Sequence, residues 1–175
     1  MEIRIAGIVN DSIVDGPGNR LTVFVQGCPH HCPGCHNPDS HDFSGGRLTD
    51  TGDILRQIRA NPLLDGITLS GGEPMCQPEA CLLLAREARL MGLNVWCYTG
   101  YTLEALLAEH EPARMALLEA VDVLVDGPFL LRQRSLDLLY CGSRNQRLLD
   151  VRKSLAAHQP VLWERPAVKY DWDNL

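Results

Sequence analysis

The chain has 175 residues, of which 45% are hydrophobic and 22% are charged, and its formal net charge is −6. These values are typical of a globular domain and exclude a disordered or fibrous protein. The negative charge argues against a general nucleic-acid binder, and no apolar run approaches the ~18 residues that cross a bilayer. The number of cysteines, seven, is odd, so they cannot all form disulfides within one chain. Because the first residues lack a basic segment followed by an apolar run, we expect a reducing, cytoplasmic setting, where cysteines usually serve metal or redox chemistry.

Apolar, β-rich segments predict strands at 21–26, 66–70, 94–98 and 121–125, with weaker candidates at 138–141 and 161–163. Caps and breakers predict helices from 49 or 50 to 60 and over 78–92, 102–109, 113–120 and 150–157. Apolar strands separated by helices imply a parallel sheet with helical crossovers. Six strands are too few for an eight-fold barrel. We therefore expect a single α/β domain over 1–175, a partial, open (β/α) barrel of about six mostly parallel strands, with a tail at 164–175.

The longest irregular stretch follows the first predicted strand and runs from residue 27 to about residue 47. It carries Cys28, Cys32 and Cys35 in a C-x₃-C-x₂-C pattern, within a loop rich in proline and glycine. Thiolates at this spacing can converge on one soft metal centre. A structural zinc site is the simple alternative, completed by one of His30, His31 and His36. The lack of a second C-x₂-C pair weighs against zinc, whereas three thiolates would leave one iron of a four-iron cluster open to a substrate.

A second candidate site follows the strand predicted at 66–70, where Gly71 and Gly72 precede Glu73. Glycine lets the backbone approach a ligand closely, and the Glu73 carboxylate could accept a charge-assisted hydrogen bond from an ammonium group. The simple alternative is a strand-to-helix turn with a solvated Glu73. Asp126 follows the strand at 121–125 on the side where ligands gather in parallel sheets, and could bind a ligand or cap a turn.

The cysteine pattern after a first strand resembles the signature of the radical S-adenosylmethionine (SAM) enzymes. The segment 70–74 matches that family's Gly-Gly-Glu motif, which contacts the methionine end of SAM. Segments 15–18 and 35–37 resemble the activases of glycyl radical enzymes. Segments 95–101, 122–129 and 142–147 resemble, more narrowly, the activases of anaerobic ribonucleoside-triphosphate reductase. The similarity extends from about residue 8 to residue 163.

The resemblance implies that Cys28, Cys32 and Cys35 hold a 4Fe–4S cluster whose open iron chelates SAM, and that one electron then releases a 5′-deoxyadenosyl radical. The residues it places at these cofactors are Gly34, Cys35, His36, Gly71, Gly72, Glu73 and Asp126. The radical would take hydrogen from a backbone glycine of anaerobic ribonucleoside-triphosphate reductase, so no acid–base pair is expected. The implied electron donor is a protein such as flavodoxin or ferredoxin, and neither nucleic acid nor a membrane is an expected partner.

Three other functions fit part of the pattern. The nearest is activation of a different glycyl radical enzyme, such as pyruvate formate-lyase. A small-molecule radical SAM enzyme, for example the synthase of carboxydeazaguanine, is the second. A zinc-stabilised binding protein without catalysis is the third and belongs to a different class.

The remaining candidates have simpler expected roles. Four cysteines without regular spacing are expected to pack as small hydrophobes, namely Cys76, Cys81, Cys97 and Cys141. We expect Trp96 to be a core residue and His30 and His31 to be solvated. Asp15 is expected to form a tight turn, and the resemblance implies instead a place beside SAM or at the entry for the partner's radical loop. A docking surface for a carboxylate-bearing partner is the hypothesis for the arginines at 132, 134, 144 and 147.

Overall fold

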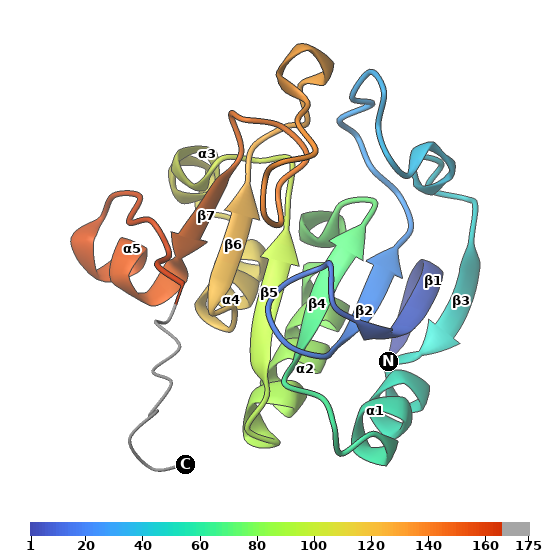
Figure 1. The fold of residues 1–175 in the computed structure, drawn as a ribbon. Coiled ribbons are helices and arrows are strands. Elements are labelled where there is room, and N and C mark those ends of the chain that lie inside the picture. Colours follow the sequence, from blue (N-terminus) through green and yellow to red (C-terminus); the bar gives the residue numbers. More distant parts are fainter. Residues whose placement is uncertain (166–175) are drawn as a thin grey trace, which may run out of the picture.

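The computed structural model describes residues 1–165, in which seven strands form one sheet with the order β3-β1-β2-β4-β5-β6-β7 (Figure 1). The four middle strands β2, β4, β5 and β6 run parallel. Strands β1 and β3 on one side and β7 on the other pair in antiparallel fashion. The strands span Glu2–Ser12 (β1), Arg20–Val25 (β2), Arg47–Asp50 (β3), Gly66–Gly71 (β4), Asn94–Tyr98 (β5), Val123–Asp126 (β6) and Arg147–Asp150 (β7).

Five α-helices connect or follow these strands, and most of them begin at a recognisable cap. They span Thr51–Ala60 (α1), Pro78–Leu90 (α2), Leu103–Glu109 (α3), Pro112–Glu119 (α4) and Val151–Ala157 (α5). Short 3₁₀ helices cover Pro38–Ser40 (η1), Pro74–Cys76 (η2) and Leu131–Gln133 (η3). The side chains of Asp50 and Thr102 accept hydrogen bonds from the first turns of α1 and α3, which satisfies backbone donors that a helix start leaves free.

The two faces of the sheet have different neighbours. Alternate residues of the middle strands, such as Val23, Leu69 and Cys97, join the helices in the main hydrophobic core. The residues between them point to the other face, as a strand requires. In Figure 1 α2 and α4 lie behind the sheet, whereas the segment between β1 and β2 crosses in front of it. That front face carries the candidate functional site.

Arg20, the first residue of β2, fastens the crossing segment to the sheet. Its buried guanidinium donates to the Thr68 hydroxyl at 2.7 Å, the Pro17 carbonyl at 3.0 Å and the Asn94 side chain at 2.7 Å. It lies 5.6 Å from the centre of the Trp96 ring. Burial lowers the pKa of Arg20 to about 10. Trp96 is a core residue as predicted, with Tyr140 and Trp163 packed against it.

The four strong strand predictions and all five helices are confirmed, and the mixed α/β class with them. The sheet has seven strands and is parallel in its middle, in line with the expectation, whereas the three pairings toward its two edges are antiparallel. The sequence prediction missed β1, β3 and β7. It was also wrong at 138–141, which is not a strand, and at 161–163, where Leu162 makes a single bridge to Leu149.

The missed strands share a physical cause. β3 and β7 have four residues each and a mixture of charged and apolar side chains, so no apolar run marks them. β1 contains Gly7 and two irregularities in its pairing with β2, which interrupt the period-two pattern of a strand. Most of the predicted tail at 164–175 lies outside the described residues. Within the described part of the chain, no helix has the length and apolar character needed to span a bilayer.

Candidate functional site

A cavity of about 350 Å³ lies at the ends of the four parallel strands, a volume in the range of small-ligand sites. Its walls are the cysteine loop (residues 27–37), the ends of β2, β4 and β5, and the segment after β6. Phe24, Ser70 and Tyr98 line it from three adjacent strands, each on the front face. This is the edge of a parallel sheet where ligands bind, because loops from several strands meet there.

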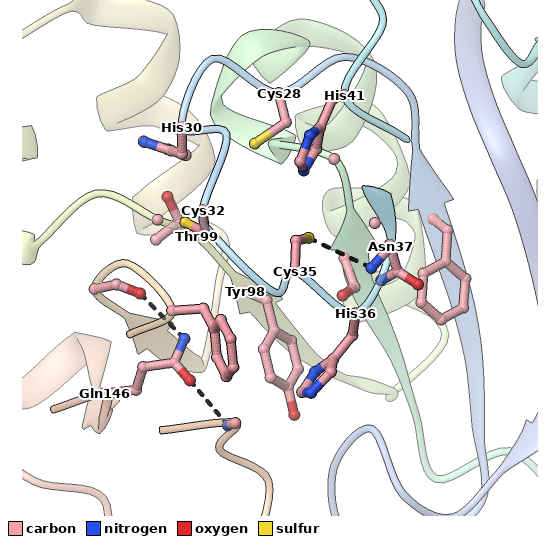
Figure 2. A pocket seen from close by; sticks show the side chains of 18 of the residues that line it. Cys28, His30, Cys32, Cys35, His36, Asn37, His41, Tyr98, Thr99 and Gln146 are labelled. Atoms are coloured by element: carbon pink, nitrogen blue, oxygen red, sulfur yellow. Dashed lines mark hydrogen bonds between the residues drawn. The ribbon is translucent and has the colours of Figure 1, made fainter. Parts of the chain in front are cut away.

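The three cysteines of the predicted cluster motif all line this cavity (Figure 2). Cys28 is buried, whereas Cys32 and Cys35 are partly exposed, and all three are free thiols. Backbone hydrogen bonds shape the loop: Cys28 N–H donates to the His41 carbonyl, and Cys35 N–H donates to the Cys32 carbonyl. Gly34 has a φ of +73°, a left-handed conformation that glycine adopts without strain.

The arrangement of these three thiols fits an iron–sulfur cluster. Each thiolate of a cluster binds a different iron, so the thiols need only surround one hollow, as Cys28, Cys32 and Cys35 do. Burial raises the pKa of Cys28, and the neighbouring charges of Glu73, Cys32 and Cys35 raise it further. A bound metal would therefore have to displace the Cys28 proton.

Gly71 and Gly72 line the cavity at the end of β4, as a ligand role requires. They are also needed for packing within the protein. A Cβ at Gly71 would lie 2.5 Å from the Val25 nitrogen, and one at Gly72 would lie 2.4 Å from the Gly27 carbonyl oxygen. The glycines thus let β4 approach β2 and the start of the cysteine loop. Their contact with SAM stays a prediction.

Glu73 is fully buried, and its carboxylate is already hydrogen-bonded inside the protein. Oε1 accepts from Met75 N–H at 3.0 Å and from the Thr99 hydroxyl at 2.9 Å. Oε2 accepts from Gly100 N–H at 2.8 Å, and the Nε2 atom of His30 lies 2.8 Å from it. The carboxylate therefore joins the cysteine loop to the ends of β4 and β5. The solvated alternative is wrong, and the contact of Glu73 with SAM stays a prediction.

His30 corrects one expectation. Its side chain is 18% exposed and lies against Glu73 and the edge of Tyr101, whose ring centre is 4.6 Å away, so it is not a solvated loop residue. A Cβ at Gly100 would lie 2.4 Å from the His30 ring, so only glycine allows this close approach. His31 is exposed, as predicted.

Asp126 is buried at the end of β6 and is paired within the protein. Its carboxylate accepts from Leu103 N–H at the start of α3 and from the Arg147 guanidinium. These hydrogen bonds raise the pKa of Arg147, and Arg147 in turn lowers the pKa of Glu104. Gly127 rather than Asp126 lines the cavity. The contact of Asp126 with SAM stays a prediction.

His36 and Gln146 complete the walls. His36 is exposed, lines the cavity and packs against Phe129 with ring centres 4.9 Å apart. Gln146 holds the opposite wall, because its side chain accepts from Gly142 N–H and donates to the Gly127 carbonyl (Figure 2). Sequence reasoning did not single out Phe24 or Gln146. Alternation along the strand could have placed Phe24 on the front face, but no local signal indicates the partners of Gln146.

Asp15 also lines the cavity, from the crossing segment. Its Oδ2 accepts from the hydroxyls of Ser12 at 2.6 Å and Thr22 at 3.0 Å. The two cysteines on α2 and β5, Cys81 and Cys97, are fully buried in the main core, which confirms their packing role.

The fold and the thiol-lined cavity define an α/β protein with a site for an iron–sulfur cluster. In agreement with this, residues 14–149 match the family described as 4Fe-4S single cluster domain. The anaerobic ribonucleoside-triphosphate reductase-activating protein of Haemophilus influenzae is 38% identical over 144 residues, 77% of this chain and 89% of that protein. Those of Escherichia coli K12 and Enterobacteria phage T4 are 37% and 32% identical, again over 77% of this chain and over 90% and 86% of their own lengths. The chain belongs to this family of activating proteins.

Among solved structures, QueE from Escherichia coli is similar over 58% of this chain and 54% of its own, with 17% sequence identity and a TM-score of 0.49. A likeness at this level is too weak to support an argument about function.

Proposed function

We propose that the protein is a radical SAM activase that generates the glycyl radical of anaerobic ribonucleoside-triphosphate reductase. The observation that carries the proposal is the arrangement of Cys28, Cys32 and Cys35 around one cavity at the ends of the parallel strands. The family supports it, because the relatives are named for activating this reductase. The finer fold description, a partial (β/α) barrel of the radical SAM type, is part of the same proposal and is supported by the four parallel middle strands.

The donor set fits a 4Fe–4S cluster, since three soft thiolates would hold three irons and leave the fourth for SAM. When bound, the cluster and SAM supply one-electron cleavage of a carbon–sulfur bond, which gives methionine and a 5′-deoxyadenosyl radical. The chain's own contribution is to orient the cofactors and exclude water. Cys28 and Cys35 would anchor the cluster from the two ends of the loop. Gly71 and Gly72 would let the methionine end of SAM approach the β4 backbone.

A second hollow offers an entrance for a polypeptide substrate. It measures about 390 Å³, lies along residues 6–9 of β1 and borders the cysteine loop. It shares Phe24, His36, Asn37 and Gly71 with the cofactor cavity, so the two hollows adjoin. A glycine-bearing loop of the reductase could reach the cofactors through it.

The same proposal includes an electron donor such as flavodoxin or ferredoxin and a cytoplasmic location, with neither nucleic acid nor a membrane as a partner. The odd number of free cysteines supports the cytoplasmic location, and the net charge of −6 argues against nucleic acid as a partner.

The decisive experiment is anaerobic. The chain is reconstituted with iron and sulfide, reduced with dithionite and given SAM, and 5′-deoxyadenosine is measured by chromatography. We expect 5′-deoxyadenosine and, with anaerobic ribonucleotide reductase added, a glycyl doublet in the electron paramagnetic resonance spectrum. One bound zinc, no iron–sulfur absorbance and no 5′-deoxyadenosine would refute the enzyme function. A glycyl doublet only with a formate-lyase would refute the assignment of the partner.

A further inference from the structure

The segment after β6, residues 127–146, forms one wall of the cofactor cavity and is called the rim loop below. Phe129, Gly142 and Gln146 of this loop line the cavity. Its 3₁₀ helix η3 also touches the cysteine loop, because a Cβ at Gly34 would lie 2.8 Å from a methyl group of Leu131. In Figure 1 the rim loop (orange) and the cysteine loop (blue) stand together beyond the ends of the parallel strands. Phe129 of the rim loop packs against His36, which lines both this cavity and the second hollow, so a segment that enters the cavity lies near the rim loop.

The rim loop carries three exposed arginines close to one another. Arg132, Arg134 and Arg144 are exposed, and none forms an ion pair with a residue among 1–165. Backbone contacts bring their two segments side by side: Arg134 bridges Ser143, and Arg144 N–H donates to the Gln133 carbonyl at 2.9 Å. With three arginines and one aspartate the loop has a net charge of +2, in a chain whose net charge is −6.

The structure separates these arginines from Arg147, which the sequence placed in the same group. Arg147 is tied to Asp126 and Glu104 and so belongs to the internal support of β6 and α3. The other three are exposed and form no ion pair with residues 1–165. Because guanidinium groups bind carboxylates in a planar, two-pronged manner, their natural partners are Asp and Glu side chains.

Exposed leucines accompany the arginines. Leu131, Leu136 and Leu139 are 51%, 87% and 51% exposed. Apolar side chains interspersed with arginine are typical of protein–protein contact surfaces, where the apolar groups are buried on binding and arginine is enriched.

We propose that the rim loop is the docking surface for the protein substrate, and that it binds an acidic segment of that protein close to the glycine to be activated. The proposal rests on the proposed function, because it assumes that a protein substrate inserts a segment into the cofactor cavity. Arg132, Arg134 and Arg144 pair with carboxylates of the substrate, and the leucines bury its apolar side chains. Since these pairs form at the edge of the interface, their strength falls as salt screens the charges.

The test compares two triple variants with the same change of net charge. The first is Arg132→Glu, Arg134→Glu and Arg144→Glu. The control is Arg56→Glu, Arg86→Glu and Arg152→Glu, three exposed arginines on the helices α1, α2 and α5. Anaerobic ribonucleotide reductase is the probe, dithionite is the reductant, and a separate series uses flavodoxin in place of dithionite. Binding to the reductase, the yield of glycyl radical and the 5′-deoxyadenosine made without reductase are measured.

We expect the rim variant to bind the reductase at least about tenfold more weakly, equivalent to about 1.4 kcal/mol, and to lose glycyl radical in proportion. Its production of 5′-deoxyadenosine without reductase should equal that of the control, and only the wild type and the control should lose affinity steeply with added salt. Unchanged binding of the rim variant would overturn the proposal. So would a defect seen only when flavodoxin replaces dithionite, because the loop would then dock the electron donor. A wild-type chain that makes no 5′-deoxyadenosine would instead refute the proposed function, which the binding measurement distinguishes.

Discussion

Replacing Glu73 by glutamine would test whether this carboxylate holds the cysteine loop in place. The carboxylate accepts from two backbone N–H groups and the Thr99 hydroxyl, and it contacts the His30 ring. Glutamine has nearly the same shape but offers only one oxygen, and its NH₂ group must face two of these four partners. Thr99 and His30 can reverse their donor and acceptor roles, whereas the backbone N–H of Met75 or Gly100 cannot.

The expected cost follows from that count. Either orientation of the new amide leaves one buried backbone N–H without an acceptor, which destabilises by about 1–3 kcal/mol. For a chain of this size, 1 kcal/mol lowers the melting temperature by about 2–4 °C. The Glu73→Gln apoprotein should therefore melt about 4–8 °C below the wild type for a central loss of about 2 kcal/mol. It should also bind less iron on reconstitution, because His30 no longer has a fixed carboxylate partner.

The assay is thermal unfolding of the metal-free protein in reducing buffer, followed by iron analysis after anaerobic reconstitution. Glu119→Gln is the matched control, because Glu119 is exposed at the end of α4. It should leave both measurements unchanged. A Glu73→Gln protein with wild-type stability and iron content but much weaker SAM binding would refute this reasoning. That result would show that the carboxylate serves SAM rather than the loop.

Further predictions concern the cysteines and the glycine turn. Cys32→Ala should abolish iron binding and 5′-deoxyadenosine formation, while the far-ultraviolet circular dichroism of the apoprotein stays unchanged. The control variant Cys76→Ala should retain the cluster. A collapsed fold in Cys32→Ala would favour structural zinc. Iodoacetamide at pH 8 should label the loop cysteines of the apoprotein before Cys81 and Cys97, because burial raises the pKa of both core thiols and blocks access to them. Mass spectrometry that finds Cys97 labelled in the folded protein would contradict this prediction. Gly72→Ala places a methyl group 2.4 Å from a backbone carbonyl oxygen and should cost about 1–3 kcal/mol in urea unfolding, where an unchanged midpoint would count against the packing.

The buried parallel strands were predictable because their signals are local. β2, β4 and β5 are short apolar runs, and caps or prolines mark the helices between them. β3 and β7 had no such signal, because four residues paired on an edge need no apolar pattern. Their existence depends on the partners they find, β1 and β6.

The candidate site, like the fold, was predictable only where its signals are local in the sequence. The sequence shows the spacing of Cys28, Cys32 and Cys35 directly, and residues so close in sequence meet in one loop. The partners of Glu73 and Asp126 could not be predicted from the sequence, because His30 is 43 residues from Glu73 and Arg147 is 21 residues from Asp126. A carboxylate before a turn has the same local sequence whether it is solvated, binds a ligand or is buried in a network.

By itself, the sequence determined the class of the fold, the order of its strong elements and the three thiols that would carry the cluster. These features rest on the periodicity of apolar residues, on the capping residues at helix ends and on the short spacing between the cysteines, all of which are set within a few residues of the chain. Only the tertiary structure decided that Glu73 is committed to His30, that Arg147 is committed to Asp126, and that the arginines of the rim loop remain free of ion pairs among residues 1–165. Burial and pairing depend on which distant segments the sheet brings together, and so no local pattern contains them.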